Sequence, residues 1–324
     1  MNAKLKSFAT IFIPLVFGAG LTYYTIQGFS DQELTQMKSY FANVNYYYVS
    51  ISLFFAFLGY VLRAYRWQFT LEHIGVKPNF ILNFLAVSVG YFINLSIPRS
   101  GEVSRALILK KYDNVPFDKA FGTIIAERIV DVLVLLFFIL VAVITEFTTL
   151  KNFLLDYIPV NKLMVLFAIA IIGLAVGFYL YKYSKLKFII FIKTKVEGLK
   201  EGALSVLNLP NKIPFLAYTL AIWVTYVLMF FYATYALKDT SSISLGAVLV
   251  AFIIGSLTIA FTNGGFGFFP VLIAKILFLY NIPLVAGNAF GWIVWTSQLI
   301  ITVFLGVLAF ILLPILTRKS KVVS

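Results

Sequence analysis

The stretch NLSIPRSGEVSRALILKKYDNVPFDKAFGTIIAERIVD, from Asn94 to Asp131, carries a high density of charge between long apolar runs. It holds five of the 13 acidic residues of the chain and six of the 26 basic ones. Arg99, Glu102 and Arg105 follow one another at intervals of three residues, so on a helix they share one broad face. The sequence therefore predicts a charged helical face at the start of this stretch.

A second charged group closes the stretch, inside the apolar run Ala120–Ile144. Glu127 and Asp131 are four residues apart, and Arg128 lies between them. A charge at bilayer depth costs roughly 3 kcal/mol on insertion scales, so such groups normally pair or line a wet cavity. We therefore predict that the two charged groups meet and form a polar site within a membrane protein.

The composition excludes an ordinary soluble globule. Of 324 residues, 61% are apolar and only 12% are charged, as is typical of a polytopic membrane protein. The net charge of +13 would favour nucleic acid as a partner in a soluble chain. Here the charges flank apolar runs, which fits topology control and anionic lipid headgroups rather than nucleic acid. The chain has no cysteine and one histidine, so we expect no thiolate or His-rich metal site and no cofactor.

We expect an all-α integral membrane protein of one domain, residues 1–324, with about eight transmembrane helices and a re-entrant segment. About 20 apolar residues cross the hydrocarbon core. The expected spans lie near Phe8–Ile26, Tyr46–Val61, Phe121–Ile144, Leu163–Tyr181, Pro214–Ala236, Leu245–Phe261, Phe268–Tyr280 and Leu284–Leu313. The polar, roughly amphipathic segments Asp31–Ala42 and Phe188–Leu209 are interpreted as interfacial.

The re-entrant segment follows from the distribution of Lys and Arg, which favours the cytoplasmic side. Lys4 and Lys6 place the N-terminus in the cytoplasm, and basic residues after the last span place the C-terminus there too. If Phe80–Ile97 crossed the membrane fully, every later loop would lie on the side of the membrane opposite to the one that its Lys and Arg content favours. We therefore predict that it enters and returns, with Gly90, Asn94 and Pro98 as helix breakers; the alternative is a plain span and a local failure of the charge rule.

A glycine-rich stretch, Asn263-Gly264-Gly265-Phe266-Gly267-Phe268-Phe269-Pro270, separates two short apolar runs in the second half. Interrupted hydrophobic segments in both halves of a chain are the best sequence pointer to a transporter site. The chain therefore has a candidate inverted repeat, with halves of about 1–160 and 161–324. Lys275 is the one charge expected inside the membrane near this stretch. The alternative is a tight loop joining two antiparallel helices.

Two motifs are familiar: N-x-x-I-P-R-x-G-E-x-x-R-A from Asn94 to Ala106, and A-E-R-I-x-D from Ala126 to Asp131. With the late glycine-rich turn, they resemble the lysylphosphatidylglycerol synthase transmembrane-region family. That family includes the flippase half of the bacterial multiple peptide resistance factor and the membrane portion of some archaeal polyprenyl-phosphate glycosyltransferases. The resemblance runs from about Arg63 to the end of the chain.

The resemblance implies a membrane-translocating protein without the synthetic half, because no soluble acyltransferase-like or glycosyltransferase domain follows the last span. The late turn departs from the family pattern. Relatives tend to have Pro-Gly-Gly-x-Gly followed by an acidic residue, whereas this chain has Asn263 in place of the proline and no acid nearby. Any role of that acid in proton coupling or headgroup binding is therefore in doubt here.

The first function to consider is a flippase of the inner (plasma) membrane, rather than an enzyme, that moves a phospholipid or polyprenyl-phosphate lipid between leaflets. Its partners would be membrane lipids with a phosphate group, and a homo-oligomer stays open. The alternatives are a membrane scaffold or regulatory subunit, and an enzyme that uses the carboxylates on a lipid-linked substrate. The residues expected to bind the substrate are Asn94, Arg99, Glu102, Arg105, Glu127, Arg128, Asp131, Asn263, Gly264, Gly265 and Lys275.

Overall fold

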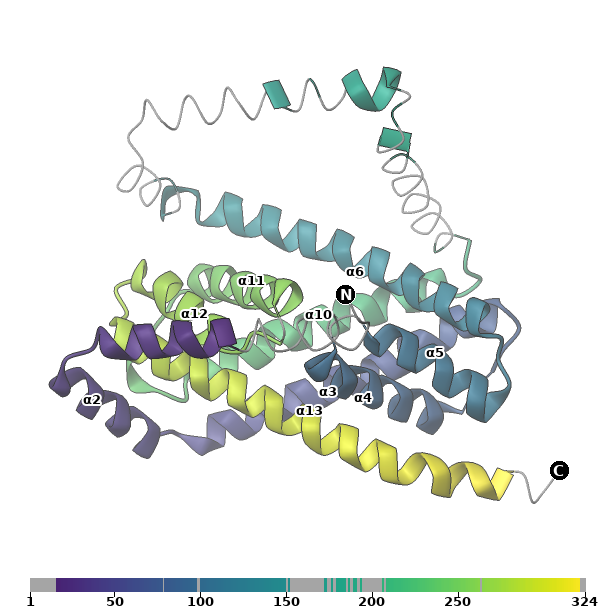
Figure 1. Cartoon of the computed structure of the whole chain (residues 1–324), viewed down its shortest axis with the longest axis horizontal. Helices are drawn as coiled ribbons and strands as arrows, with labels where there is room; N and C mark the ends of the chain where they lie inside the picture. Colours follow the sequence, from purple (N-terminus) through teal and green to yellow (C-terminus); the bar gives the residue numbers. More distant parts are fainter. Residues whose placement is uncertain are drawn as a thin grey trace.

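The protein is an all-α, multi-pass membrane protein, seen here in a computed structural model (Figure 1). The structure describes residues 16–77, 79–97, 100–149, 151, 208–262 and 264–320, together with isolated residues between 172 and 206. Two expected elements, the span Leu163–Tyr181 and the interfacial segment Phe188–Leu209, lie mostly outside the described residues. The same holds for the first part of the span Phe8–Ile26, of which residues 16–26 are helical.

The first half contains a long helix, a helical hairpin and a second long helix. In chain order they are α3 (Tyr46–His73), α4 (Phe80–Ser96), α5 (Ser100–Asp113) and α6 (Phe117–Thr145). Asparagine side chains cap the first two of these helices, since Asn45 and Asn79 accept hydrogen bonds from the backbone two residues later.

The hairpin α4/α5 is closed by glycines rather than by a helix break within α4. A Cβ on Gly101 would lie 2.2 Å from the carbonyl oxygen of Gly90, so the two backbones approach as only glycine permits. Asn94 accepts a hydrogen bond of 2.7 Å from the Gly101 backbone N–H. The expected break at Gly90 and Asn94 is therefore wrong, because α4 runs through both to Ser96. Pro98 lies outside the described residues, and entry of this hairpin into a membrane stays a prediction.

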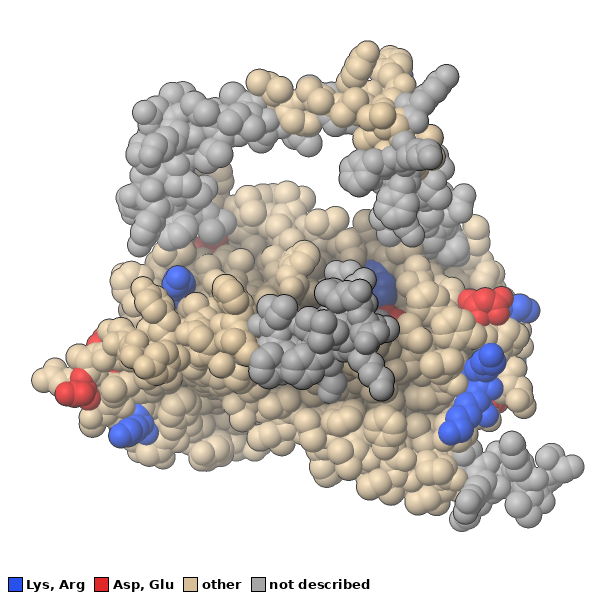
Figure 2. Space-filling view, in the orientation of Figure 1, with Lys and Arg blue, Asp and Glu red and all other residues tan. Residues whose placement is uncertain are grey.

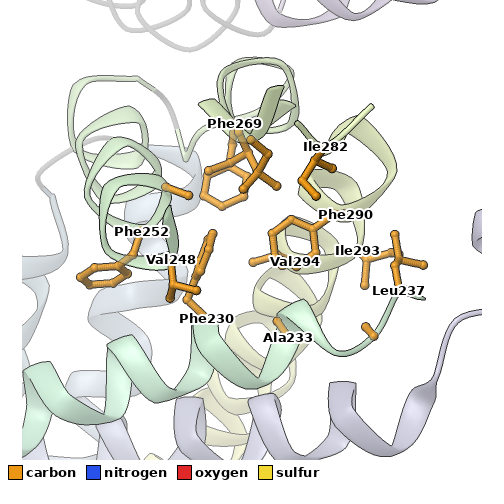
Figure 3. Packing of buried hydrophobic residues seen from close by; sticks show 14 of the residues in the cluster. Phe230, Ala233, Leu237, Val248, Phe252, Phe269, Ile282, Phe290, Ile293 and Val294 are labelled. Carbon is orange, nitrogen blue, oxygen red and sulfur yellow. The ribbon is translucent and has the colours of Figure 1, made fainter. Parts of the chain in front are cut away.

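The second half repeats this order. It contains α10 (Lys212–Thr234), the short helix η1 (Lys238–Thr240), α11 (Leu245–Phe261), α12 (Phe268–Phe278) and α13 (Leu284–Ser320). Between α11 and α12 the chain turns through Gly264, Gly265 and Gly267, which all have positive φ. Two phenylalanines of this hairpin, Phe252 and Phe269, belong to the same buried apolar cluster as Phe230 of α10 and Phe290 of α13 (Figure 3).

The two halves interlock through matching pairs of helices. The central helices α3 and α10 pack along each other, while α4 packs against α13 and α11 packs against α6. The counterparts of α3, α4 and α6 in the second half are α10, α11 and α13. Each of these contacts therefore has a matching contact between the corresponding helices. Figure 1 shows the same relation: the two hairpins lie toward opposite ends of the long axis, and α6 and α13 run along opposite sides.

Four of the described helices, α3, α6, α10 and α13, are long and apolar enough to cross a membrane. The expected spans Leu245–Phe261 and Phe268–Tyr280 correspond to shorter apolar helices, α11 and α12. With 11 residues, α12 is only about 16 Å long, roughly half of the hydrocarbon core. Where side chains are drawn in Figure 2, charged residues lie mostly near the two ends of the long axis, as expected for a molecule with a membrane belt.

The segment predicted to be interfacial forms α2 (Asp31–Ala42), whose first turn is closed by a capping box between Ser30 and Glu33. Tyr40 donates a hydrogen bond to the carboxylate of Asp239 in η1, the short helix that follows α10. Burial, reinforced by that carboxylate, raises the pKa of Tyr40 to about 12, so the hydroxyl stays a donor at neutral pH. This contact ties α2 to the end of α10.

Candidate functional site: a buried arginine–carboxylate cluster

Asp131 of α6 receives more ion pairs than any other carboxylate among the described residues. Arg66 of α3 grips it with both terminal nitrogens, at 2.6 Å and 3.1 Å, and Arg63 donates to it at 3.1 Å. Arg66 also donates to the hydroxyl of Thr219 on α10 at 3.2 Å. Two parallel bonds between a guanidinium and a carboxylate are among the strongest polar contacts in proteins. Asp131 therefore fixes α3, α6 and α10 to one another.

Glu127, one helical turn earlier, is held less completely. Arg105 of α5 donates to one of its oxygens at 3.0 Å, while the Nε of Arg66 is 3.6 Å from the other. The Arg105 guanidinium lies 3.9 Å above the ring of Trp67, a cation–π contact that compensates part of its desolvation. Gly90 makes room for this arginine, because a Cβ there would lie 3.0 Å from its Cγ.

A third, more open pair joins the cluster to solvent. Arg128 lies 3.6 Å from Glu102 of α5 and 3.6 Å from Asp131. The side chains of Arg128 and Glu102 are 35% and 21% exposed, whereas those of Arg66 and Glu127 are 0% and 1% exposed. The cluster therefore has a buried end at α3 and an accessible end at α5.

The charges and hydrogen bonds of the cluster do not balance. Four arginines (Arg63, Arg66, Arg105, Arg128) face three carboxylates (Glu102, Glu127, Asp131), which leaves one positive charge in excess. The Nε atoms of Arg66, Arg105 and Arg128 are buried without a hydrogen-bond acceptor among the described residues. One buried oxygen each of Glu102 and Glu127 likewise has no donor there. Unsatisfied buried groups of this kind are costly. This arrangement has donors and charge to offer to an anion.

Tyrosine hydroxyls extend the cluster toward α4 and α10. The Nε of Arg63 donates to the hydroxyl of Tyr226, and that hydroxyl lies 3.1 Å from the hydroxyl of Tyr91. The Arg63 guanidinium lies over both rings, 5.4 Å and 5.8 Å from their centroids. These contacts hold Arg63 in place from the side opposite Asp131.

The structure brings together five of the residues that the sequence predicted: Glu102, Arg105, Glu127, Arg128 and Asp131. The predicted meeting of the two charged groups is thereby confirmed for the described residues, although their binding of a lipid stays a prediction. Asn94 lies beside them as the acceptor for the Gly101 backbone. Arg99 and Asn263 lie outside the described residues.

The remaining predicted residues lie elsewhere. Gly264 and Gly265 form the turn between α11 and α12, where Gly264 accepts a hydrogen bond of 2.8 Å from the Trp295 indole. Lys275 is exposed on α12 and has no ion-pair partner among the described residues. Trp292 and Trp295 of α13 pack against Phe266 of this turn.

Three residues of the cluster, Arg63, Arg66 and Trp67, are not among those that the sequence predicted to bind the substrate. The expected span Tyr46–Val61 ends before all three of them. Since α3 continues to His73, both arginines and Trp67 are buried within it. The spacing of three residues between the arginines, like that of Arg99 and Glu102, is the signal that would have placed them on a helix.

The cluster does not resemble a metal site. In the part of the chain that the structure describes, no three His, Asp or Glu side chains are close enough to hold a metal ion. Its carboxylates are instead interleaved with arginines, which compete with a cation for the same oxygens. The geometry therefore favours recognition of an anion over coordination of a divalent cation.

Comparisons with known proteins show which sequences this chain is similar to. The family model described as the lysylphosphatidylglycerol synthase TM region matches residues 11–306. A UPF0104 membrane protein of Methanocaldococcus jannaschii is 34% identical over 143 residues, which are 41% of this chain and 43% of that protein. A UPF0104 membrane protein of Pyrococcus horikoshii is 24% identical over 121 residues, 36% of each chain. The chain thus matches less than half of the length of either relative. No solved structure matches.

Proposed function

The chain belongs to the lysylphosphatidylglycerol synthase transmembrane-region family, and on that premise we propose that it is a lipid translocase. It would move a phospholipid or polyprenyl-phosphate lipid between the leaflets of the cell's inner membrane, with both of its termini in the cytoplasm. The headgroup would pass through the polar interior while the acyl or prenyl chains stay in lipid. In this proposal the chain binds and moves its lipid without changing it chemically.

The observation that supports this most is the excess positive charge in the buried cluster. An anionic phosphate would neutralise it and would supply acceptors to the unpaired Nε atoms of Arg66 and Arg105. Glu127 would then give up its partner Arg105 to the phosphate and take it back when the headgroup leaves. The more exposed pair Arg128–Glu102 would form the entrance.

The hairpin α4/α5 gives this site a route of access. As proposed, it is re-entrant, so Arg105 lies at membrane depth while the end of α5 with Lys110 and Lys111 stays on the cytoplasmic side. Helices interrupted at membrane depth commonly hold the substrates of transporters. The hairpin α11/α12 would enter from the opposite side.

A scaffold role is the second candidate, and the contacts of Asp131 favour it for that part of the cluster. Asp131 receives three hydrogen bonds from two arginines and so has little capacity for exchange. The two roles divide the cluster: Asp131, Arg63 and Arg66 would hold the helices, and Arg105 and Glu127 would exchange partners with the substrate.

The test is reconstitution of the purified chain in vesicles that contain a fluorescent phosphatidylglycerol. Arg105→Gln and Glu127→Gln should slow transfer between leaflets by at least about tenfold, because each removes a charged partner that the headgroup needs. Lys38→Gln is the matched control, since Lys38 is an exposed charge on α2, outside the cluster. Equal transfer by all variants would refute the proposal, and unfolding of both cluster variants would favour the scaffold.

A further inference from the structure

A row of hydroxyl groups leads away from the cluster into the second half of the molecule. It begins where Arg63 donates to Tyr226 and continues to Tyr91, whose hydroxyl is 3.1 Å from that of Tyr226. The ring of Tyr91 packs 4.8 Å from that of Tyr60, and the Tyr60 hydroxyl lies 2.9 Å from the hydroxyl of Thr302. Four helices, α3, α4, α10 and α13, each contribute to this row.

The row continues along α13. Gln298 lies four residues before Thr302 and therefore on the same face of the helix. The Nε2 of Gln298 is buried without a hydrogen-bond partner among the described residues, so it is an unused donor at this point. Trp295, a further turn along, donates to Gly264 in the turn between α11 and α12. The polar groups thus reach from the charged cluster to the opposite hairpin.

The chemistry of the row complements that of the cluster. A phosphate that leaves the arginines for an apolar interior loses its hydrogen bonds, which is prohibitively costly unless other donors replace them. Phenol, hydroxyl and amide groups provide such donors without burying a second set of charges. Because they are neutral, they hold the phosphate more weakly than guanidinium groups do, which permits its release.

We infer that Tyr226, Tyr91, Tyr60, Thr302 and Gln298 form a second, uncharged binding station for the phosphate of the transported lipid. This inference rests on the proposed translocase function and deepens it, since it assigns the passage between the cluster and the turn at Gly264. Gly59 supports the station: a Cβ there would lie 2.9 Å from the ring of Tyr226, so the glycine lets this ring lie against α3.

A row that served only to pack the helices would respond differently to the loss of its hydroxyl groups. A hydroxyl–hydroxyl contact between membrane helices adds little to stability, because the groups find other partners when it is lost. If the row serves only packing, removing hydroxyls while keeping the rings should change neither stability nor transport. If it is a station, transport should fall although stability does not.

The experiment compares the double variant Tyr60→Phe/Tyr91→Phe with Tyr218→Phe, both reconstituted with fluorescent phosphatidylglycerol. The double variant leaves the arginine cluster and the Tyr226 contact to Arg63 intact. Tyr218 is the matched control because it lies on α10 two turns before Tyr226. Its ring packs against Tyr65 and Phe69, and its hydroxyl has no hydrogen-bond partner in the part of the chain that the structure describes. Three quantities are measured: the transfer rate, the unfolding temperature, and binding of the same lipid to the protein in detergent.

We expect the double variant to transfer lipid about tenfold more slowly, because the phosphate loses two donors midway. Its lipid binding should stay within about twofold of the original, since the arginines are unchanged. Transfer at the original rate would overturn the inference, as would equal slowing by Tyr218→Phe or slowing matched by a lower unfolding temperature. If Arg105→Gln stops transfer while the double variant does not, only the inference fails; if the unmodified chain moves no lipid, the proposed function fails with it.

Discussion

The hairpins α4/α5 and α11/α12 occupy the same place in their halves of the chain but are filled with different chemistry. In both, the first helix has 17 residues, and its eleventh, Gly90 or Gly255, makes room for a side chain from the second helix. At Gly90 that side chain is Arg105, which pairs with Glu127. At Gly255 it is Phe269, which packs into the apolar core shown in Figure 3.

This difference shows that the helical hairpin, the framework shared by both halves, forms with or without a charged site in it. The shared framework needs close backbone approach and a turn, and glycine supplies both in either half. The charges need charged partners, and among the described residues of the two hairpins only α5 has them, on α6. A headgroup that passes from one hairpin to the other would therefore move from a charged environment to a neutral one.

The largest expected effect is at Asp131, which has no counterpart in the second half. Asp131→Ala leaves Arg63 buried without a carboxylate and Arg66 with only its 3.6 Å contact to Glu127, and this should destabilise the fold by roughly 3–5 kcal/mol. Thermal unfolding of the purified variant in detergent measures it. A change of less than about 1 kcal/mol would mean that other groups satisfy the arginines and that the two halves are less different than described.

The next largest loss of stability is expected when the glycines that close the two hairpins, Gly101 and Gly264, are replaced by alanine. Gly101→Ala places a methyl 2.2 Å from the Gly90 carbonyl oxygen, so α4 and α5 must separate, at a cost of about 1–3 kcal/mol. Gly264→Ala meets only Leu95, at 3.7 Å, and should cost about 1–2 kcal/mol for its positive φ. The unfolding temperatures of the two variants should therefore fall in that order; the reverse order would place the tighter crossing in the second hairpin.

A smaller effect is expected at Trp295, which ties α13 to the second hairpin. Trp295→Phe keeps an aromatic ring beside Phe266 but removes the hydrogen bond to Gly264, which should cost about 1 kcal/mol. Hydrogen exchange at the turn should increase while exchange in α4 and α5 stays unchanged. Equal increases in both hairpins would show that the two move as one unit.

The smallest effect is expected at Asn288 of α13, a buried polar residue of the second half. Its side-chain oxygen has no hydrogen-bond partner among the described residues, and the residue is 1% exposed. Asn288→Leu should therefore change stability by less than about 1 kcal/mol or increase it, in contrast to Asp131. A loss of more than about 2 kcal/mol in thermal unfolding would show that this amide is engaged as fully as the charges are.

Several features of the molecule were predictable because they depend on local sequence. Continuous apolar runs predict membrane helices, and the structure has helices at Tyr46–His73, Phe117–Thr145 and Lys212–Thr234 where such runs occur. The pairing of Glu102 and Arg105 with charges of α6 was predictable, because a charge in an apolar setting requires a partner. Helix ends were less predictable: α3 extends twelve residues past Val61, since tertiary burial of Arg63 and Arg66 allows it to continue through charged positions.

The sequence by itself determined that this is an α-helical membrane protein and that Glu127, Arg128 and Asp131, which lie inside an apolar run, must be paired. Only the tertiary structure decided the partners. Arg66 and Asp131 are 65 residues apart in the chain, and their contact exists because α3 packs beside α6 and α10 with both side chains at the same depth. The cost of an unpaired buried charge is a local property of the sequence, whereas the identity of the group that pairs with it depends on which helices pack together.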